Sequence, residues 1–227
     1  MDGQTSRYIN ILIAYPFSVV FCIILGILVL RKDKKYWGNR FFALTFWFFG
    51  MGLTFTIIYL FSNNYFLIAF LNLLSISIVN IGAFTLLLGI LVIYKGEDEI
   101  IEGNLRYFFI IIIIIVNLFR ALIPQGIRVE LNVPIWSIIF GIYEIIIGET
   151  LFAIILYFSL ILYKELSQDM KKKFKFFILG VIFVDITVLG VIINNMHIIQ
   201  GFEVIRNILN AGAFIGAILI YFGIIKR

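Results

Sequence analysis

Charged residues are scarce in this chain of 227 residues. Asp, Glu, Lys and Arg make up 14% of it, hydrophobic residues make up 63%, and the mean hydropathy is +1.10. Soluble domains carry about a quarter charged and about half apolar residues. The chain is therefore too apolar for a water-soluble fold. Its composition predicts a multi-pass protein of the cell membrane, whose main partner is the lipid bilayer.

Cysteine and histidine occur once each, as Cys22 and His197. One cysteine excludes a disulfide framework within the chain, and one histidine excludes a histidine-rich metal site, so we expect no metal. No phosphate-binding loop or nucleophile motif is present, so we expect no catalytic residue and not an enzyme. Retinal bound as a Schiff base is excluded because every lysine lies in a loop or at a helix end. No resident cofactor is therefore expected.

Long apolar runs dominate the rest of the sequence. Seven of them approach or exceed the roughly 20 helical residues that cross a bilayer. They cover residues 8–30, 41–61, 66–94, 107–123, 134–163, 174–196 and 204–225. The sequence thus predicts an all-α integral membrane bundle of seven transmembrane helices, forming one domain over residues 1–227.

Basic residues lie mainly on one side of the predicted spans. The loops after the first, third and fifth spans and the C-terminus hold all but four of the 18 Lys and Arg residues, the exceptions being Arg7, Arg120, Arg128 and Arg206. Cytoplasmic loops are enriched in Lys and Arg, so the N-terminus is predicted outside and the C-terminus in the cytoplasm. Because the net charge of +5 follows the span ends, we expect no nucleic-acid partner.

The chain contains an internal echo. Residues 208–214 (ILNAGAF) match residues 78–84 (IVNIGAF) at five of seven positions, and three further short matches recur at separations of 131 to 135 positions. These are residues 28–33 with 160–165, 40–42 with 175–177, and 63–64 with 194–195. This spacing predicts a 3+1+3 parallel repeat, with repeat 1 over about 8–94, a linker helix over about 107–123 and repeat 2 over about 134–225.

Polar residues inside the spans mark a candidate site. Asn80 and Asn210 are the matched amides of the repeat, and an amide in hydrocarbon needs a hydrogen-bond partner. Ser77 lies one helical turn before Asn80, and Arg206 and Asn207 lie one turn before Asn210. We therefore predict a ligand site near mid-membrane formed by these five residues. Most of these groups lie in the outer half of the predicted bilayer, which favours an outward-facing pocket over a continuous pore.

Three acidic residues also fall within the predicted spans, namely Glu144, Glu149 and Asp185. An ionisable group in the membrane is by default a functional candidate. Gly141 and Gly148 share a helix face with Glu144, so we expect Glu144 rather than Glu149 to point inward. Asp185 and Glu144 are the candidates for proton or ion coupling. The alternative for Asp185 is a neutral carboxyl hydrogen-bonded to a neighbouring helix.

The seven-span layout and the amides Asn80 and Asn210 resemble the SWEET and PQ-loop transporters, a superfamily sometimes grouped with microbial rhodopsins. In SWEET transporters the matching asparagine pair lines the substrate site, which the resemblance carries to these two residues. The family's hinge prolines are missing, since the chain has only Pro16, Pro124 and Pro134. A fainter likeness is to the seven-span sensor regions that precede histidine kinases.

Three functions remain open from the sequence. The first is a transporter for a small polar solute. The second is a membrane sensor or receptor that binds an external ligand and signals to a cytoplasmic partner. The third is a non-catalytic assembly subunit without a ligand.

Overall fold

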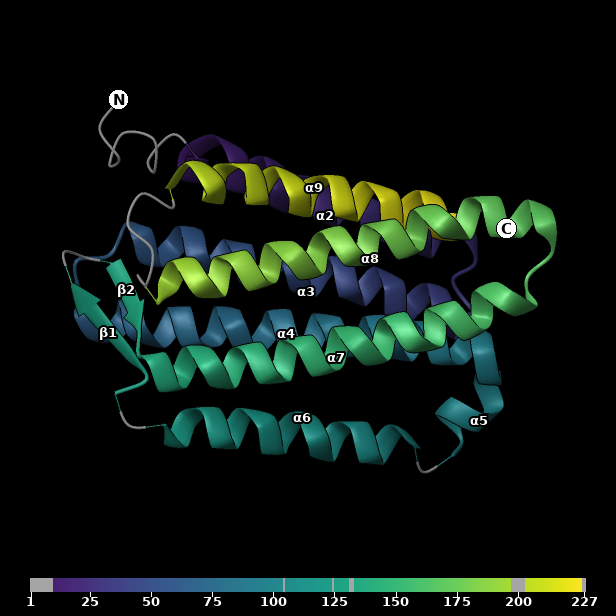
Figure 1. Ribbon diagram of the computed structural model, residues 1–227, viewed down its shortest axis with the longest axis horizontal. Coiled ribbons are helices and arrows are strands. Elements are labelled where there is room, and N and C mark those ends of the chain that lie inside the picture. The colour runs from purple at the N-terminus through teal and green to yellow at the C-terminus, as the bar shows by residue number, and fades with distance from the viewer. Residues whose placement is uncertain (1–9, 104, 124, 131–132, 197–202, 226–227) are drawn as a thin grey trace.

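The computed structural model describes residues 10–103, 105–123, 125–130, 133–196 and 203–225. Within these ranges the side chains of residues 10, 11, 105, 106, 203–211 and 225 lie outside the described part. The described chain is mostly helical (Figure 1). Its elements are η1 (Asn10–Ala14), α2 (Tyr15–Lys32), α3 (Trp37–Leu60), α4 (Tyr65–Lys95), α5 (Glu97–Ile101), α6 (Leu105–Leu122), β1 (Ile127–Glu130), β2 (Val133–Trp136), α7 (Ile138–Glu165), α8 (Gln168–Asn195) and α9 (Glu203–Ile225).

Five helical stretches are long and apolar enough to cross a membrane. They are Leu12–Lys32, Trp37–Leu60, Tyr65–Lys95, Ile138–Glu165 and Gln168–Asn195. Two shorter apolar stretches, Tyr107–Leu122 and Gly212–Ile224, fall where the fourth and seventh spans are predicted. The fold is thus an all-α bundle compatible with a multi-pass membrane protein, as the composition predicted.

Local sequence explains where the helices begin and end. The side chain of Asn64 accepts a hydrogen bond from the N–H of Leu67 (3.1 Å) and caps α4, and Ser137 caps α7 in the same way through Phe140 (3.2 Å). Gly96, with φ of 101°, ends α4 in a conformation that glycine adopts without strain.

A small β-hairpin lies between α6 and α7, where we expected only a loop and the start of the fifth span. Strands β1 and β2 pair antiparallel, with Ile127 opposite Trp136 and Glu130 opposite Val133. Helix α7, which corresponds to the fifth predicted span, therefore begins at Ile138 rather than at Pro134, because residues 133–136 are held in the strand pair. Four-residue strands with one proline lack the alternating pattern that would identify them in an Ile-rich sequence.

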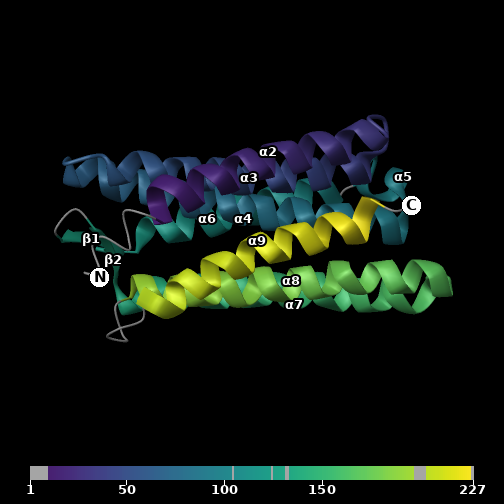
Figure 2. The same ribbon diagram turned by 90° about the horizontal axis from the view of Figure 1, so that it is seen from above.

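The bundle is built from two groups of three helices. The tertiary contacts concentrate within α2, α3 and α4 and within α7, α8 and α9, and the groups meet mainly through α4 with α7 and α2 with α9. Figure 2 shows α2 and α3 on one side, α7 and α8 on the other, and α9 crossing obliquely between them. Helix α6 lies at the edge of the bundle and contacts α4 and α7.

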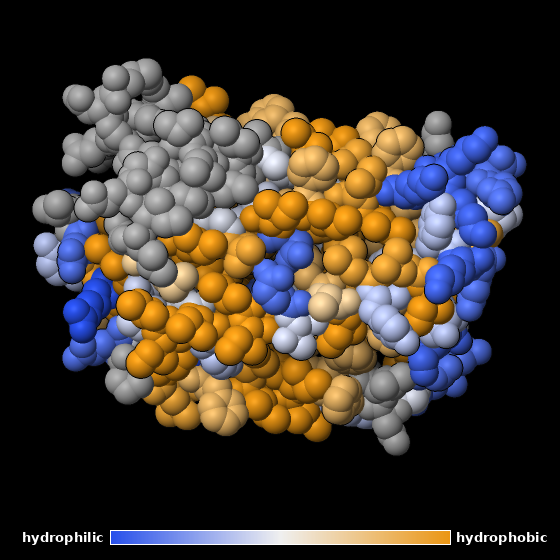
Figure 3. Space-filling view, viewed as in Figure 1, coloured by the Kyte–Doolittle hydropathy of each residue, from blue (hydrophilic) through white to orange (hydrophobic). Residues whose placement is uncertain are grey.

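The two ends of the bundle differ in composition. The hairpin lies at one end, called here the hairpin end (Figure 1). The α2–α3 and α7–α8 connections, with the Lys and Arg residues around them, lie at the other, called here the basic end. Figure 3 shows an apolar surface between hydrophilic ends, interrupted by one small hydrophilic patch near its middle. This surface has the form expected of a protein surrounded by hydrocarbon.

Glycines bring the helices into close contact inside each group. A methyl group on Gly180 of α8 would lie 2.6 Å from both the carbonyl oxygen of Gly216 and the backbone nitrogen of Ile220 in α9. A methyl group on Gly89 of α4 would lie 2.9 Å from the ring of Phe42 in α3. These small residues allow the backbones to approach, as in other membrane bundles.

Candidate functional site

A cavity of about 470 Å³ lies between the two groups of helices. Its lining comes from all six helices of the two groups and from strand β2, and it runs from Leu60, Pro134 and Asn195 at the hairpin end to Thr45 and Ile220 in the basic half of the bundle. Cavities of about 300–1,000 Å³ hold small-molecule ligands in proteins. The position between the groups makes this cavity the candidate functional site.

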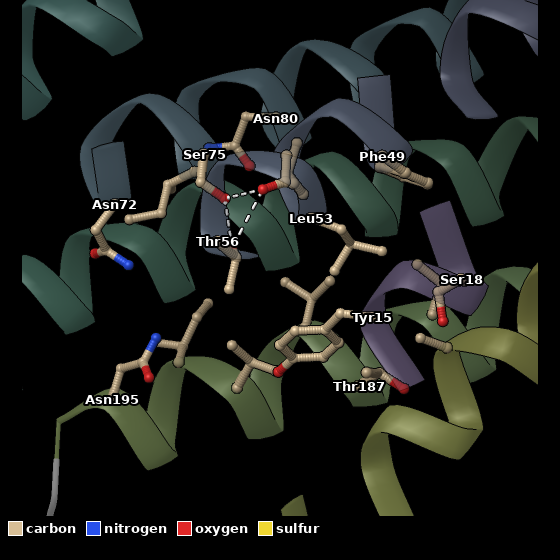
Figure 4. A pocket seen from close by; sticks show the side chains of 18 of the residues that line it. Tyr15, Ser18, Phe49, Leu53, Thr56, Asn72, Ser75, Asn80, Thr187 and Asn195 are labelled. Carbon is tan, nitrogen blue, oxygen red and sulfur yellow. Dashed lines mark hydrogen bonds between the residues drawn. The ribbon is translucent and has the colours of Figure 1, made fainter. Parts of the chain in front are cut away.

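Most of the cavity wall is apolar, but it also carries hydroxyl groups and side-chain amides, from Tyr15, Ser18, Thr45, Thr56, Tyr59, Ser75 and Thr187 and from Asn72, Asn80, Asn194 and Asn195. Figure 4 shows Asn72, Ser75 and Asn80 of α4 along one wall, with Asn195 of α8 opposite Asn72. Ser75 is already bonded, since it donates to the carbonyl oxygen of Gly52 (2.7 Å) and shares a hydrogen bond with Thr56 (3.1 Å). A side-chain amide has two donor hydrogens and an acceptor oxygen, so Asn72 and Asn80 keep hydrogen-bonding capacity beyond the one bond that each makes among the described residues.

Asn72 is 4% exposed and is held by one bond from the hairpin. The indole N–H of Trp136 donates to its Oδ1 at 2.9 Å, and Trp136 is itself 4% exposed. Among the described residues the amide nitrogen of Asn72 has no hydrogen-bond acceptor, and Figure 4 shows this side chain at the cavity wall. A buried donor without a partner is unusual in proteins and suggests a place for a ligand or water.

Asn80 lies near the middle of α4. Within the described part of the chain, its free group is the amide oxygen, whereas that of Asn72 is the amide nitrogen. Its Nδ2 donates to Glu144 Oε2 of α7 at 3.3 Å, which fixes the orientation of the side chain. Among the described residues its Oδ1 has no donor, and the residue lines the cavity (Figure 4). The two asparagines therefore offer a donor and an acceptor to the same space.

Behind Asn80 lies a buried ion pair between α6 and α7. Arg120 Nε donates to Glu144 Oε1 (2.5 Å) and Arg120 Nη2 donates to Glu144 Oε2 (3.0 Å), with both side chains almost wholly buried. Arg120 Nη1 donates to Ser77 Oγ (3.0 Å) and to Asn117 Oδ1 (2.6 Å). Every nitrogen of the guanidinium is thus bonded, and both carboxylate oxygens are occupied. Such a bidentate, fully bonded pair is the form in which charges are tolerated in a low-dielectric interior.

Packed apolar side chains close the cavity toward the basic end. Phe42, Phe46, Phe177, Val181 and Ile220 are each no more than 2% exposed and belong to one core cluster. Phe46 and Ile220 also line the cavity, so this cluster forms its floor. We call these five residues the plug.

The structure brings several of the predicted site residues together. Ser77 and Asn80 of α4 meet Glu144 of α7 through one hydrogen-bond network, and Glu144 rather than Glu149 points inward, as predicted. Asp185 does not join them. It is half-buried and lies beside Glu149 of α7, on the face of α8 that also holds the buried Val181 and the exposed Ile182. The side chains of Arg206, Asn207 and Asn210 lie outside the described residues.

Sequence reasoning missed the partner of Glu144. We counted Arg120 among the residues at the outer surface, but it is 2% exposed and lies in the bundle. A signal existed, since Arg120 is a basic residue inside an apolar run and Glu144 is an acid in the next one. Asn72 and Trp136 were also missed as a pair, because the hairpin that carries Trp136 was not foreseen.

Comparisons with family models, with curated proteins and with solved structures find no match to this chain.

Proposed function

We propose that this chain is a membrane transporter that binds a small polar solute in the cavity between its two groups of helices. The observation that carries the proposal is the cavity itself, which is lined by both groups, passes the middle of α4 at Asn80 and ends at the packed plug in the basic half of the bundle. Alternating access requires a central site between two bodies that move against each other. With the basic end in the cytoplasm, the described conformation has its site on the outer side.

The distribution of contacts supports such a movement. Packing is dense within each group and sparse between them, so the groups can tilt without losing most of their internal contacts. The chain lacks prolines within α3, α4, α7, α8 and α9, so the movement we propose is a rigid-body tilt of the groups rather than bending at proline hinges.

The ligand contacts of this proposal are Asn80 and Asn210, with Arg206 and Asn207 around them. Ser77, predicted with them, lies behind Asn80, where its hydroxyl accepts a hydrogen bond from Arg120, and it supports the site from there. Asn210 lies on α9 three and four residues before Ala213 and Phe214, which line the cavity. The coupling role of Glu144 stays a prediction, as does that of Asp185. In the described conformation Glu144 is engaged with Arg120 and Asn80, so a proton could reach it only after the network opens.

Uptake into liposomes tests the proposal. Purified protein is reconstituted, the vesicles are exposed to a mixture of neutral and charged metabolites, and their contents are analysed by mass spectrometry. We expect one class of solute to accumulate, and Asn80→Ala and Asn210→Ala each to reduce its uptake at least tenfold. Asn63→Ala, an exposed asparagine outside the cavity lining, is the matched control and should transport normally. Unchanged uptake in both site variants would refute this assignment.

A sensor is the second candidate, and the basic end favours it. There Arg40 lies over the ring of Trp37 (4.5 Å) and donates to the carbonyl oxygen of Lys34 (2.8 Å), while the N–H of Trp37 donates to Glu97 Oε1 of α5 (2.6 Å). An ordered basic surface opposite the cavity suits a signalling partner. A solute that raises the unfolding temperature of the protein but never enters liposomes would favour the sensor.

A further inference from the structure

We infer that the cavity selects an uncharged amphiphilic solute, with a hydrogen-bond acceptor at one end, a donor at the other and an apolar body between them. This inference rests on the proposed function, because it names the class of solute that the same cavity takes. It depends on three features, which are the charge of the wall, the unpaired halves of two amides and the apolar surface between them.

The wall is electrically balanced in the described part of the chain. Glu144 is the only carboxylate among the described lining residues, and none of those residues is Lys, Arg or His. Both oxygens of Glu144 are bonded to Arg120, which lies behind the wall, so the pair presents no net charge to the cavity. A charged solute would therefore lose more hydration free energy than a neutral one without gaining a counter-charge from these residues.

The two amides determine the orientation in which a solute binds. Asn72 offers its unpaired Nδ2 donors, because Trp136 already occupies its oxygen. Asn80 offers its unpaired Oδ1, because Glu144 already occupies its nitrogen. Each amide is thus locked by its partner so that only one of its two ends is available. Asn72 and Asn80 are eight positions apart on α4, which corresponds to roughly 12 Å along the helix axis.

The wall between the two amides is hydrophobic. Ile76 and Val79 lie between them on α4, and Phe49 and Leu53 of α3 line the same space. Ser75 and Thr56 lie there too, but their hydroxyls are bonded to each other and to Gly52. A solute that bridges the amides therefore needs an apolar middle, and a fully hydroxylated sugar would leave hydroxyl groups unpaired against this surface.

Three probes with one benzyl body and different charges test the inference. Each places a benzyl body between two end groups: 1,4-phenylenediacetamide is neutral, 4-(carbamoylmethyl)phenylacetate is an anion, and 4-(aminomethyl)phenylacetamide is a cation. Binding is measured by the shift in unfolding temperature of the full chain in detergent and by titration calorimetry. We expect the neutral probe to bind at least tenfold more tightly than either ion. Equal or tighter binding of an ion, or no binding of the neutral probe at its highest soluble concentration, would overturn the inference.

Two variants test the amides themselves. Asn80→Leu should weaken binding of the neutral probe about tenfold. Asn72→Asp keeps an oxygen for Trp136, so the hairpin stays attached, but it replaces the donors with a negative charge. It should lose the neutral probe and gain the cation. Asn63→Leu, outside the cavity, is the control. Unchanged binding in both site variants would place the solute elsewhere.

The outcome is separable from that of the transport experiment. A neutral probe that binds but is not taken up into liposomes would sustain this inference and refute transport. Uptake of a charged metabolite that depends on Asn80 would sustain transport and refute this inference.

Discussion

Phe42 of α3 and Phe177 of α8 meet edge to face in the plug, with their ring centroids 6.1 Å apart and their planes at 68°. The two residues are third in the matched triplets 40–42 and 175–177, so they occupy corresponding positions in the two predicted repeats. Corresponding residues meet each other only near an axis that relates the copies. The contact supports the repeat as a proposal, in which the axis would run through the plug.

The first prediction concerns this plug. Phe177→Ala removes a fully buried ring and should lower the free energy of unfolding by about 3–5 kcal/mol. It should also join the cavity to the basic end, so that liposomes carrying the variant leak preloaded solute. Thermal unfolding and efflux measure the two effects. Phe176→Ala, next in sequence but 47% exposed on the surface, is the control and should change neither. If the variant stays folded and its liposomes retain the solute, the plug is not the barrier.

The second prediction concerns the ion pair of Arg120 and Glu144. Removing one partner leaves a buried charge without its counter-charge, so Arg120→Met or Glu144→Gln alone should cost about 3–5 kcal/mol. The double variant removes both charges and should recover most of that loss. A double-mutant cycle on thermal stability measures the coupling. The exposed pair Lys95–Glu99 offers the comparison, since Lys95→Met should cost less than about 1 kcal/mol. If the stability losses of the two single variants simply add in the double variant, the ion pair between Arg120 and Glu144 is contradicted.

Composition and hydropathy were enough to predict a helical membrane bundle. Apolar runs of about 20 residues have few alternatives in any fold, and their approximate positions follow from length alone. The inward orientation of Glu144 also followed from the sequence, because Gly141 on its face leaves room for a neighbouring helix, although Gly148 on the same face borders the cavity instead. A methyl group on Gly141 would in fact overlap the side chain of Met196.

Pairings between distant helices could not be predicted in the same way. Whether Arg120 meets Glu144 depends on the depth and rotation of α6 against α7, and neither is encoded in one apolar run. Asn72 gains its role only through Trp136, whose position depends on the register of a hairpin with four residues in each strand. Helical periodicity specifies a face, but it does not specify which side chain of another helix lies opposite.

The third prediction concerns Asp185. Its carboxyl has no hydrogen bond or ion pair among the described residues, is half-buried, and lies beside Glu149. Asp185→Leu should therefore raise the free energy of unfolding by about 1–3 kcal/mol and leave solute binding unchanged. Thermal unfolding with and without the neutral probe measures both. If the variant is stable and binds solute but no longer accumulates it in liposomes, Asp185 acts in coupling, as its position in the sequence suggested.

The fourth prediction concerns the contact between α8 and α9. The methyl group of Gly180→Ala would lie 2.6 Å from two backbone atoms of α9, which cannot rotate away as a side chain can. The two helices must separate, so the unfolding temperature should fall by an amount corresponding to about 1–3 kcal/mol. Gly148→Ala is the matched control for stability alone, because nothing lies within 4 Å of its added methyl group and alanine favours the helix, whereas Gly148 itself lines the cavity. It should be neutral or slightly stabilising. Since α9 carries Ala213, Phe214 and Ala217 into the cavity wall, Gly180→Ala should also weaken solute binding, and normal affinity in a destabilised variant would show that the site tolerates displacement of α9.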